Sequence, residues 1–309
     1  MDTQLAAARK TLNHILRGKE KVVDLCIIAL LSKGHVLLED LPGVGKTTLA
    51  YALAKIVNGS FQRIQFTSDM LPTDVIGVNV FLPQEKEFVF KPGPIFANFV
   101  LADELNRTSP KTQSSLLEVM ERGIITVDGT QHMMPQPYMV IATQNPMDYE
   151  STFTLPDSQL DRFLISLSIG FPEFDAEMEV LAREFHHYDQ LKIDPIFSPE
   201  SLIEWQARVH KIYVDPEVAR FLLQIIHATR DDPLFRKGVS TRGAISLQHA
   251  ARAAALLNGR EYVSPEDIQQ VLAPVLGHRL QLTRSVALEK MREEVRMELN
   301  LLFNRFEQP

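Results

Sequence analysis

The sequence predicts an α/β domain built on a parallel sheet, followed by a smaller all-α domain. Short apolar runs alternate with helical stretches through the first half of the chain, and after Pro199 only helical signals follow. A length of 309 residues suits two domains at the usual ~150 residues each. We expect the first domain to span 1–190 and the second to span 191–309.

The elements of the first domain follow from apolar runs and turn residues. Ser109 and Pro110 are typical of the N-cap and first turn of a helix, which should end at Gly123. Two segments, 78–90 and 124–138, are expected hairpins that interrupt the alternation. The expected strands are residues 35–38, 99–102, 138–142 and 164–167.

In the second domain, helix starts are the clearest signals. Asp215-Pro216-Glu217 and the capping box 264–267 each precede an apolar-periodic stretch. The charged segment 284–306 is expected to form a last amphipathic helix.

Composition narrows the classes of protein. Lys and Arg number 32 against 39 Asp and Glu, a net charge of −7, which argues against nucleic acid as the main partner. The longest apolar run, Leu25 to Leu31, is far shorter than the roughly 20 residues of a membrane-spanning helix. The N-terminus lacks the pattern of a signal peptide. A single cysteine, Cys26, excludes an internal disulfide, which fits a cytoplasmic protein. Because Cys26 lies within the apolar run, we expect it in the core.

A glycine-rich loop between an expected strand and an expected helix predicts phosphate binding. Its glycines let backbone N–H groups form an anion nest at a helix N-terminus. Lys46 should reach the β- and γ-phosphates of ATP, and the Thr47 hydroxyl should hold Mg²⁺. Asp40 stands where the full pattern has its first glycine. The expected nucleotide-binding residues are Pro42, Gly43, Val44, Gly45, Lys46, Thr47 and Thr48.

Two carboxylates close the apolar run 99–102. Ligands of open α/β sheets bind at the carboxyl ends of the strands, where Asp103 and Glu104 should lie. Asp103 is expected to complete the Mg²⁺ shell, and Glu104 to act as general base toward the attacking water.

Four segments together resemble the MoxR family of AAA+ ATPases: 37–47 (LLEDLPGVGKT), 102–107 (ADELNR), 142–146 (ATQNP) and 155–163 (LPDSQLDRF). The resemblance implies an AAA+ core in which the two hairpins are inserts, followed by a small all-α lid. It also implies a ring-forming, hexameric bacterial ATPase with chaperone-like activity. Proteins with a von Willebrand factor A domain are the partners that it implies.

The resemblance carries further roles onto single residues. Asn145 matches sensor 1, which orients the water, and Arg162 matches the arginine finger that acts on the neighbouring subunit's nucleotide. Arg242 matches sensor 2, in the first turn of a helix capped by Ser240. From the residues alone, the alternative for Arg162 is an ion pair with a nearby aspartate, Asp157 or Asp161.

Other candidates have plainer interpretations. His186-His187 near Asp189 suggests either a metal site or, more simply, a polar linker. Trp205 is expected to pack within a helical domain.

Four functions fit these motifs: an ATP-driven protein remodeller, a nucleic-acid motor, a metal-chelatase ATPase subunit, or a non-hydrolysing scaffold. The hairpins favour the first, because 124–138 contains no Lys or Arg and 78–90 contains only Lys86, between Glu85 and Glu87. Apolar hairpin residues either grip a protein client or simply pack the hairpins; these are Val80, Phe88, Phe90, Met133 and Met134.

Overall fold

A computed structural model describes residues 3–145, 153–181, 188–283 and 288–307, and it has a parallel sheet at its centre. All the strand pairs in this sheet are parallel, in the order β2-β5-β8-β1-β9. The predicted α/β architecture is confirmed. The strands are β1 (Val36–Glu39), β2 (Phe61–Gln65), β5 (Phe99–Asp103), β8 (Met139–Gln144) and β9 (Ile165–Leu167).

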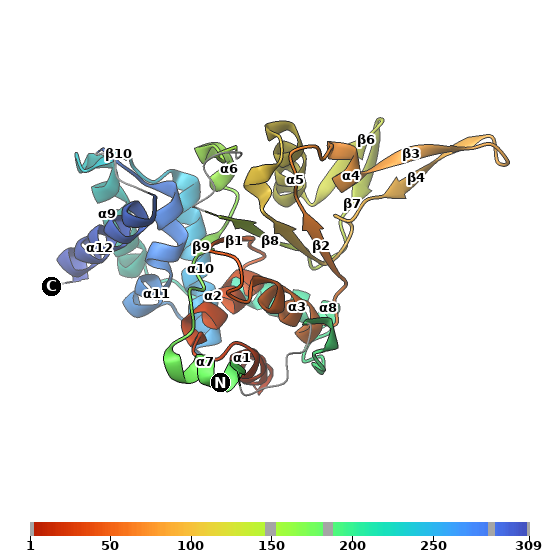
Figure 1. Cartoon of the computed structure of the whole chain (residues 1–309). Helices are drawn as coiled ribbons and strands as arrows, with labels where there is room; N and C mark the ends of the chain where they lie inside the picture. Colours follow the sequence, from red (N-terminus) through yellow and green to blue (C-terminus); the bar gives the residue numbers. More distant parts are fainter. Residues whose placement is uncertain (1–2, 146–152, 182–187, 284–287, 308–309) are drawn as a thin grey trace.

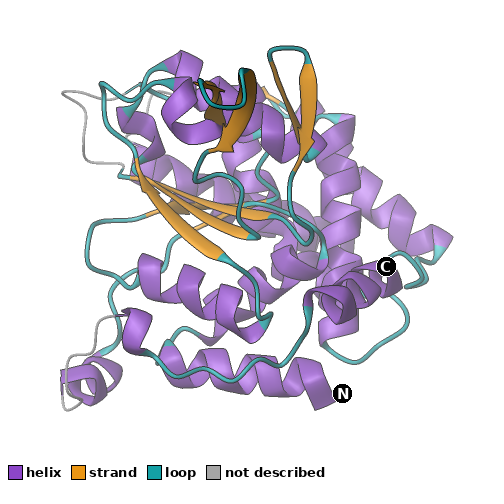
Figure 2. Cartoon of the chain, turned by 90° about the vertical axis from the view of Figure 1, so that its right-hand side faces the viewer, coloured by secondary structure: helices purple, strands orange, loops and turns teal. Residues whose placement is uncertain are grey.

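Helices bury both faces of the sheet (Figures 1 and 2). Val36 and Leu38 join the core cluster on the side of α1 (Thr3–Ile15), α2 (Glu20–Leu31) and α3 (Lys46–Ile56). Leu37 joins the cluster on the side of α4 (Pro72–Ile76) and α5 (Pro110–Arg122). Strands buried on both faces read as continuous apolar runs, which is why the inner strands were predictable.

Two hairpins project from the side of the sheet that carries α5 (Figure 1). β3 (Gly77–Leu82) pairs with β4 (Glu87–Pro92), and β6 (Ile124–Val127) pairs with β7 (Thr130–Met133). Both predicted hairpins are confirmed. A hydrogen bond from Asn79 Nδ2 to Asp128 Oδ2, at 2.7 Å, joins them.

The chain after Pro199 is mainly helical, as predicted. Ser240 is the N-cap of α10, because its Oγ accepts a hydrogen bond from the Gly243 N–H. The expectation of helices alone was wrong, because β10 and β11 form a short antiparallel pair there. Strands of two or three residues are too short to show a period. The elements are α8 (Pro199–Val209), α9 (Pro216–Asp231), β10 (Phe235–Lys237), α10 (Thr241–Leu257), α11 (Pro265–Leu276), η3 (Gly277–Arg279), β11 (Gln281–Leu282) and α12 (Leu288–Glu307).

The domain boundary at residue 190 stays a prediction. Four short helices connect the larger elements in the described residues. They are η1 (Leu105–Arg107), α6 (Asp157–Leu160), α7 (Phe174–Leu181) and η2 (Tyr188–Gln190). Among the described helices, none combines the length and the apolar character that crossing a membrane requires.

Two single residues behave as the sequence indicates. Cys26 is buried, and burial raises the pKa of its thiol to about 12. Trp205 is buried, and its indole N–H donates to Gln4 Oε1 at 3.0 Å.

Candidate nucleotide site

The glycine-rich loop links β1 to α3, and its backbone has the form of an anion nest. Gly43 and Gly45 have φ angles of +88° and +93°, in the region that L side chains rarely adopt. Gly45 is the N-cap of α3, so the first N–H groups of this helix face the loop. Lys46 Nζ donates to the Asp40 backbone oxygen at 3.0 Å, which holds the ammonium over the loop.

Asp40, which replaces the first glycine of the usual pattern, anchors the loop to the residues that follow β9. Its buried carboxylate accepts hydrogen bonds from Ser168 Oγ and Ile169 N, both at 2.6 Å, and from Gly170 N at 3.0 Å. The departure from the pattern therefore adds a bond between the loop and the chain after β9.

The two acidic residues lie where β5 ends, as predicted. Asp103 accepts from Thr143 Oγ1 at 2.7 Å and forms an ion pair with Arg63 Nη2 at 2.5 Å. Glu104 has a φ of +56°, uncommon for a residue with a side chain and frequent at functional sites. Its carboxylate accepts from Gln65 and Arg107, both at 2.8 Å.

One cavity of about 280 Å³ brings the loop, the acidic pair and Asn145 together. The Thr47 hydroxyl and the Asp103 carboxylate supply the hard oxygen donors that Mg²⁺ prefers, and such sites use few protein ligands because phosphate oxygens complete the shell. The donor set therefore fits Mg²⁺. The lining residues are Pro42, Gly43, Gly45, Lys46, Thr47, Thr48, Arg63, Gln65, Asp103, Glu104 and Asn145.

Val44 alone among the predicted loop residues does not line this cavity. Its side chain packs against the apolar core that α1, α2 and α3 share.

The two predicted arginines also lie outside the cavity, where they meet on one carboxylate of α5. Arg162 Nη2 is 3.3 Å from Glu121 Oε2, and Arg242 Nη2 donates to Glu121 Oε1. The hydrogen bond from Arg242 lowers the pKa of Glu121. The alternative of a local ion pair for Arg162 was wrong: Asp157 pairs with Lys237 and Asp161 with Arg279 instead.

Arg162 also has an unused donor. Its side chain is 26% exposed, and its Nε is a buried atom without a hydrogen-bond acceptor among the described residues.

The prediction from sequence missed Arg63, Gln65 and Thr143. Arg63 and Gln65 stand two apart, so they share one face of β2. Only Ile64 of that edge strand is buried, so no apolar run announced it. Thr143 precedes the predicted sensor by two residues and links Asp103 to the Glu104 backbone N–H, which donates to it at 2.9 Å.

His186 and His187 lie outside the described residues, as does Pro146. Within the parts of the chain that the structure covers, no group of three or more His, Cys, Asp or Glu side chains is arranged to hold a metal.

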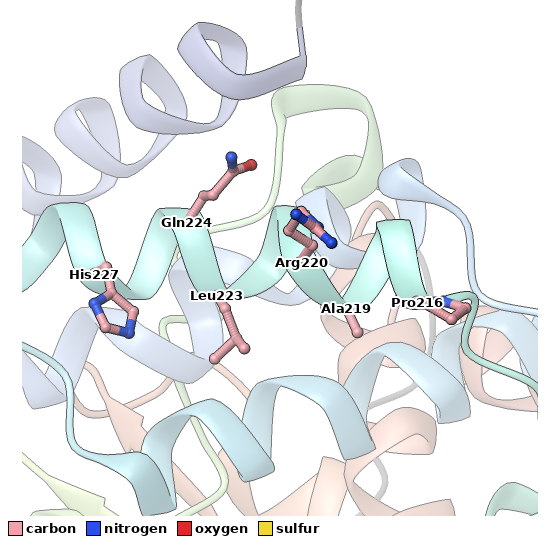
Figure 3. A pocket seen from close by; sticks show the side chains of 6 residues that line it. All are labelled: Pro216, Ala219, Arg220, Leu223, Gln224 and His227. Carbon is pink, nitrogen blue, oxygen red and sulfur yellow. The ribbon is translucent and has the colours of Figure 1, made fainter.

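A second concavity runs along α9 and shares no residue with the nucleotide cavity (Figure 3). Leu223 and Ala219 point to one side of the helix and Gln224 to the other.

Comparison with family models places the same segments in known families. Residues 35–165 match the model of the ATPase family associated with various cellular activities (AAA), and residues 227–298 match an AAA lid domain.

Three bacterial relatives match along most of the chain. The Bacillus subtilis protein YeaC is 46% identical, covering 94% of this chain and 91% of its own length. Chaperone MoxR1 of Mycobacterium tuberculosis is 38% identical, covering 91% and 77%. Protein MoxR of Paracoccus denitrificans is 31% identical, covering 93% and 90%.

Solved structures show the same fold. The crystal structure of a candidate ATPase from Cytophaga hutchinsonii superposes with a TM-score of 0.84 at 32% identity, covering 94% of this chain and 93% of that one. An MCM homologue from Methanopyrus kandleri has a TM-score of 0.60 at 18% identity, covering 90% and 59%, so it shows a shared fold alone.

Proposed function

This chain belongs to the MoxR family of AAA+ ATPases, and on that premise we propose that it couples Mg²⁺-dependent ATP hydrolysis in a ring to the remodelling of protein clients. The observation that carries the proposal is the division of the predicted machinery between two places. The loop, the acidic pair and Asn145 share a cavity, whereas Arg162 and Arg242 lie outside it on Glu121.

Within the cavity, each side chain has a chemical task. The loop N–H groups and Lys46 would bind the β- and γ-phosphates, and Thr47 and Asp103 would hold a Mg²⁺ ion that neutralises charge on those phosphates. Glu104 accepts the proton of the attacking water, and Asn145 orients that water. Arg63 donates to Asp103 Oδ2, so a Mg²⁺ ion held by Asp103 would share this carboxylate with Arg63.

The arginines support a ring. A charge that stabilises the transition state must reach the γ-phosphate, and neither guanidinium lines the cavity of its own subunit. The Arg162 side chain is 26% exposed, so part of its guanidinium is accessible to the nucleotide of a second subunit. A closed hexamer, the state that the family resemblance implies, gives every cavity one such neighbour.

The hairpins support a protein client. Phe81 and Phe88, on the β3–β4 hairpin, pack together with ring centroids 5.2 Å apart, yet they remain 48% and 70% exposed. Met133 is 74% exposed. Exposed apolar groups suit an unfolded polypeptide segment or a von Willebrand factor A domain partner, whereas nucleic acid requires cations that face phosphates.

Two of the five apolar hairpin residues pack instead. Phe90 stacks on His132 with centroids 3.9 Å apart, and Met134 is buried. A third, Val80, is half-buried, so only Phe88 and Met133 of the five are well exposed. The client surface that we propose consists of these two residues and Phe81, which the prediction did not include and which packs beside Phe88.

Mixing of inactive variants tests the central claim. Rings of Arg162→Ala or of Lys46→Ala alone should hydrolyse little ATP, because each lacks one half of every active site. Mixed rings contain interfaces that join an intact loop to an intact finger, so they should recover hydrolysis. Lack of recovery in rings shown to mix would assign Arg162 to its own subunit or to structure alone.

A further inference from the structure

The segment that carries Arg162 is held by the lid as well as by the sheet and α5. We define the finger segment as residues 157–164, from α6 to the start of β9; Figure 1 shows α6 beside the lid elements. Three lid side chains besides Arg279 bind it. They are Lys237 and Gln281, which contact Asp157 at 3.3 and 2.8 Å, and His278, which contacts Phe163 O at 3.0 Å.

Arg279 is the centre of this attachment. Its guanidinium donates to Asp161 Oδ1 at 2.7 Å, to Phe163 O at 2.7 Å and to Leu164 O at 3.2 Å. It therefore binds the backbone C-terminal to Arg162 and the residue immediately before it. The Arg279 side chain is only 4% exposed, and the planar fork of a guanidinium fixes its acceptors more rigidly than an ammonium does.

A chain of contacts joins η3, which ends at Arg279, to the end of β1, where the phosphate loop begins. Glu39 ends β1, immediately before Asp40, and its carboxylate accepts two hydrogen bonds from Arg292 of α12, each at 3.0 Å. Arg292 Nη1 also donates at 2.8 Å to the backbone oxygen of Gly277, the first residue of η3. η3 ends at Arg279.

We propose that Arg279 is a positioning residue that fixes Arg162 to the lid, so that the lid of one subunit sets the finger presented to the next subunit's nucleotide. This inference rests on the proposed function, because it requires Arg162 to act in trans. The physical basis is that Arg279 is buried and binds acceptors on both sides of Arg162. Arg279 also ends η3, whose first residue, Gly277, accepts a hydrogen bond from Arg292, the partner of Glu39. A shift of the lid therefore acts directly on the backbone beside Arg162.

The direct test is ATP turnover by Arg279→Gln and Arg279→Lys rings. Misplacing a reacting group by about 1 Å costs roughly 10²-fold in rate, so we expect kcat to fall by that order for Arg279→Gln with an unchanged KM for ATP. Arg279→Lys keeps the charge but loses the fork, and we expect a smaller fall. Arg260→Gln is the matched control, because Arg260 pairs with Asp267 inside the lid at 2.5 Å and its contacts stay within the lid.

The complementation pattern separates positioning from general damage. Arg279→Gln subunits keep an intact loop, so they should regain turnover when mixed with Lys46→Ala subunits, which supply an intact finger. They should gain nothing from Arg162→Ala subunits, because every finger in those rings is then defective. A lid that merely unfolds would fail with both partners.

Each outcome decides between the claims. Normal turnover in Arg279→Gln rings, or rescue by Arg162→Ala subunits, overturns the positioning proposal. Normal turnover in Arg162→Ala rings overturns the proposed function instead. If Arg279→Gln does not fold, Arg279→Lys decides: wild-type kcat in that variant overturns the proposal, and a reduced kcat with the same complementation pattern supports it.

Discussion

Single carboxylates set the geometry of the nucleotide site. Asp40 anchors the phosphate loop to Ile169 and Gly170, whereas Asp103 is shared between Thr143 and Arg63. Glu104 sits at the strand end in a backbone conformation that costs about 1–3 kcal/mol and that the surrounding bonds maintain.

Asp40→Gly restores the usual loop pattern, yet we expect it to destabilise the protein. The change leaves the N–H groups of Ile169 and Gly170 without their acceptor, which should lower the free energy of unfolding by about 2–3 kcal/mol. Urea unfolding measures this, with the exposed Asp194→Gly as the control. Equal stability of the two variants would contradict the anchoring interpretation.

Glu104→Gln should retain ATP binding while losing hydrolysis. The amide has nearly the same shape as the carboxylate but cannot accept the proton of the water, so turnover should fall roughly 10²- to 10⁴-fold. Titration with ATP and a phosphate-release assay measure the two effects separately. Full turnover would mean that another group activates the water.

At the scale of elements, α12 is the clearest long-range contribution. Its Arg292 neutralises Glu39, which lies at the end of β1. Burial by itself would raise the pKa of Glu39, but Arg292, together with hydrogen bonds from Ser166 and Gln144, outweighs burial and lowers it.

Arg292→Leu should therefore destabilise the whole chain. An unpaired buried carboxylate remains, and breaking such a pair costs about 3 kcal/mol or more. Since the lowered pKa of Glu39 favours folding above its ordinary value, 4.5, the loss should be full near neutral pH and shrink as the pH falls below that value. Thermal unfolding measures it, with the exposed Arg296→Leu on the same helix as control. Similar melting temperatures for both variants would contradict this interpretation.

The elements also show which features a sequence reveals. The inner strands and the glycine-rich loop were predictable because burial on two faces and positive φ angles leave local traces in residue type. β2 was not, because an edge strand with one buried residue lacks such a trace. The partners of Arg162 and Asp161 lie about 40 and 118 positions away, so no local pattern identifies them.

At the scale of the whole molecule, buried imidazoles make the fold sensitive to acid. Burial lowers the pKa of His35 to about 4, although a hydrogen bond to Met120 O opposes the shift. Burial, reinforced by neighbouring cations, likewise lowers the pKa of His249 to about 4. The same two causes hold the pKa of His278 well below its ordinary value. The unfolded chain therefore binds more protons than the folded one as soon as the pH drops below about 6.5.

We expect the free energy of unfolding to decrease from pH 6.5 down to 4. The His35 shift from 6.5 to about 4 corresponds to about 3 kcal/mol across that window. His35→Gln should flatten the pH dependence, whereas the exposed His227→Gln should leave it unchanged. Denaturant unfolding at several pH values measures both, and parallel curves for wild type and His35→Gln would refute the assignment.

The cluster of Arg162, Glu121 and Arg242 holds two cations and one anion on a chain whose net charge is −7. Acidic subunits repel one another, and added salt screens that repulsion over a Debye length of about 8 Å at 0.15 M. The same salt weakens the attraction between the excess cation and the phosphates of a neighbour's nucleotide. Added salt therefore has two opposite effects: it favours assembly of the ring, and it weakens the contact between the arginine and the neighbour's nucleotide. We expect ATP turnover to pass through a maximum at intermediate salt concentration.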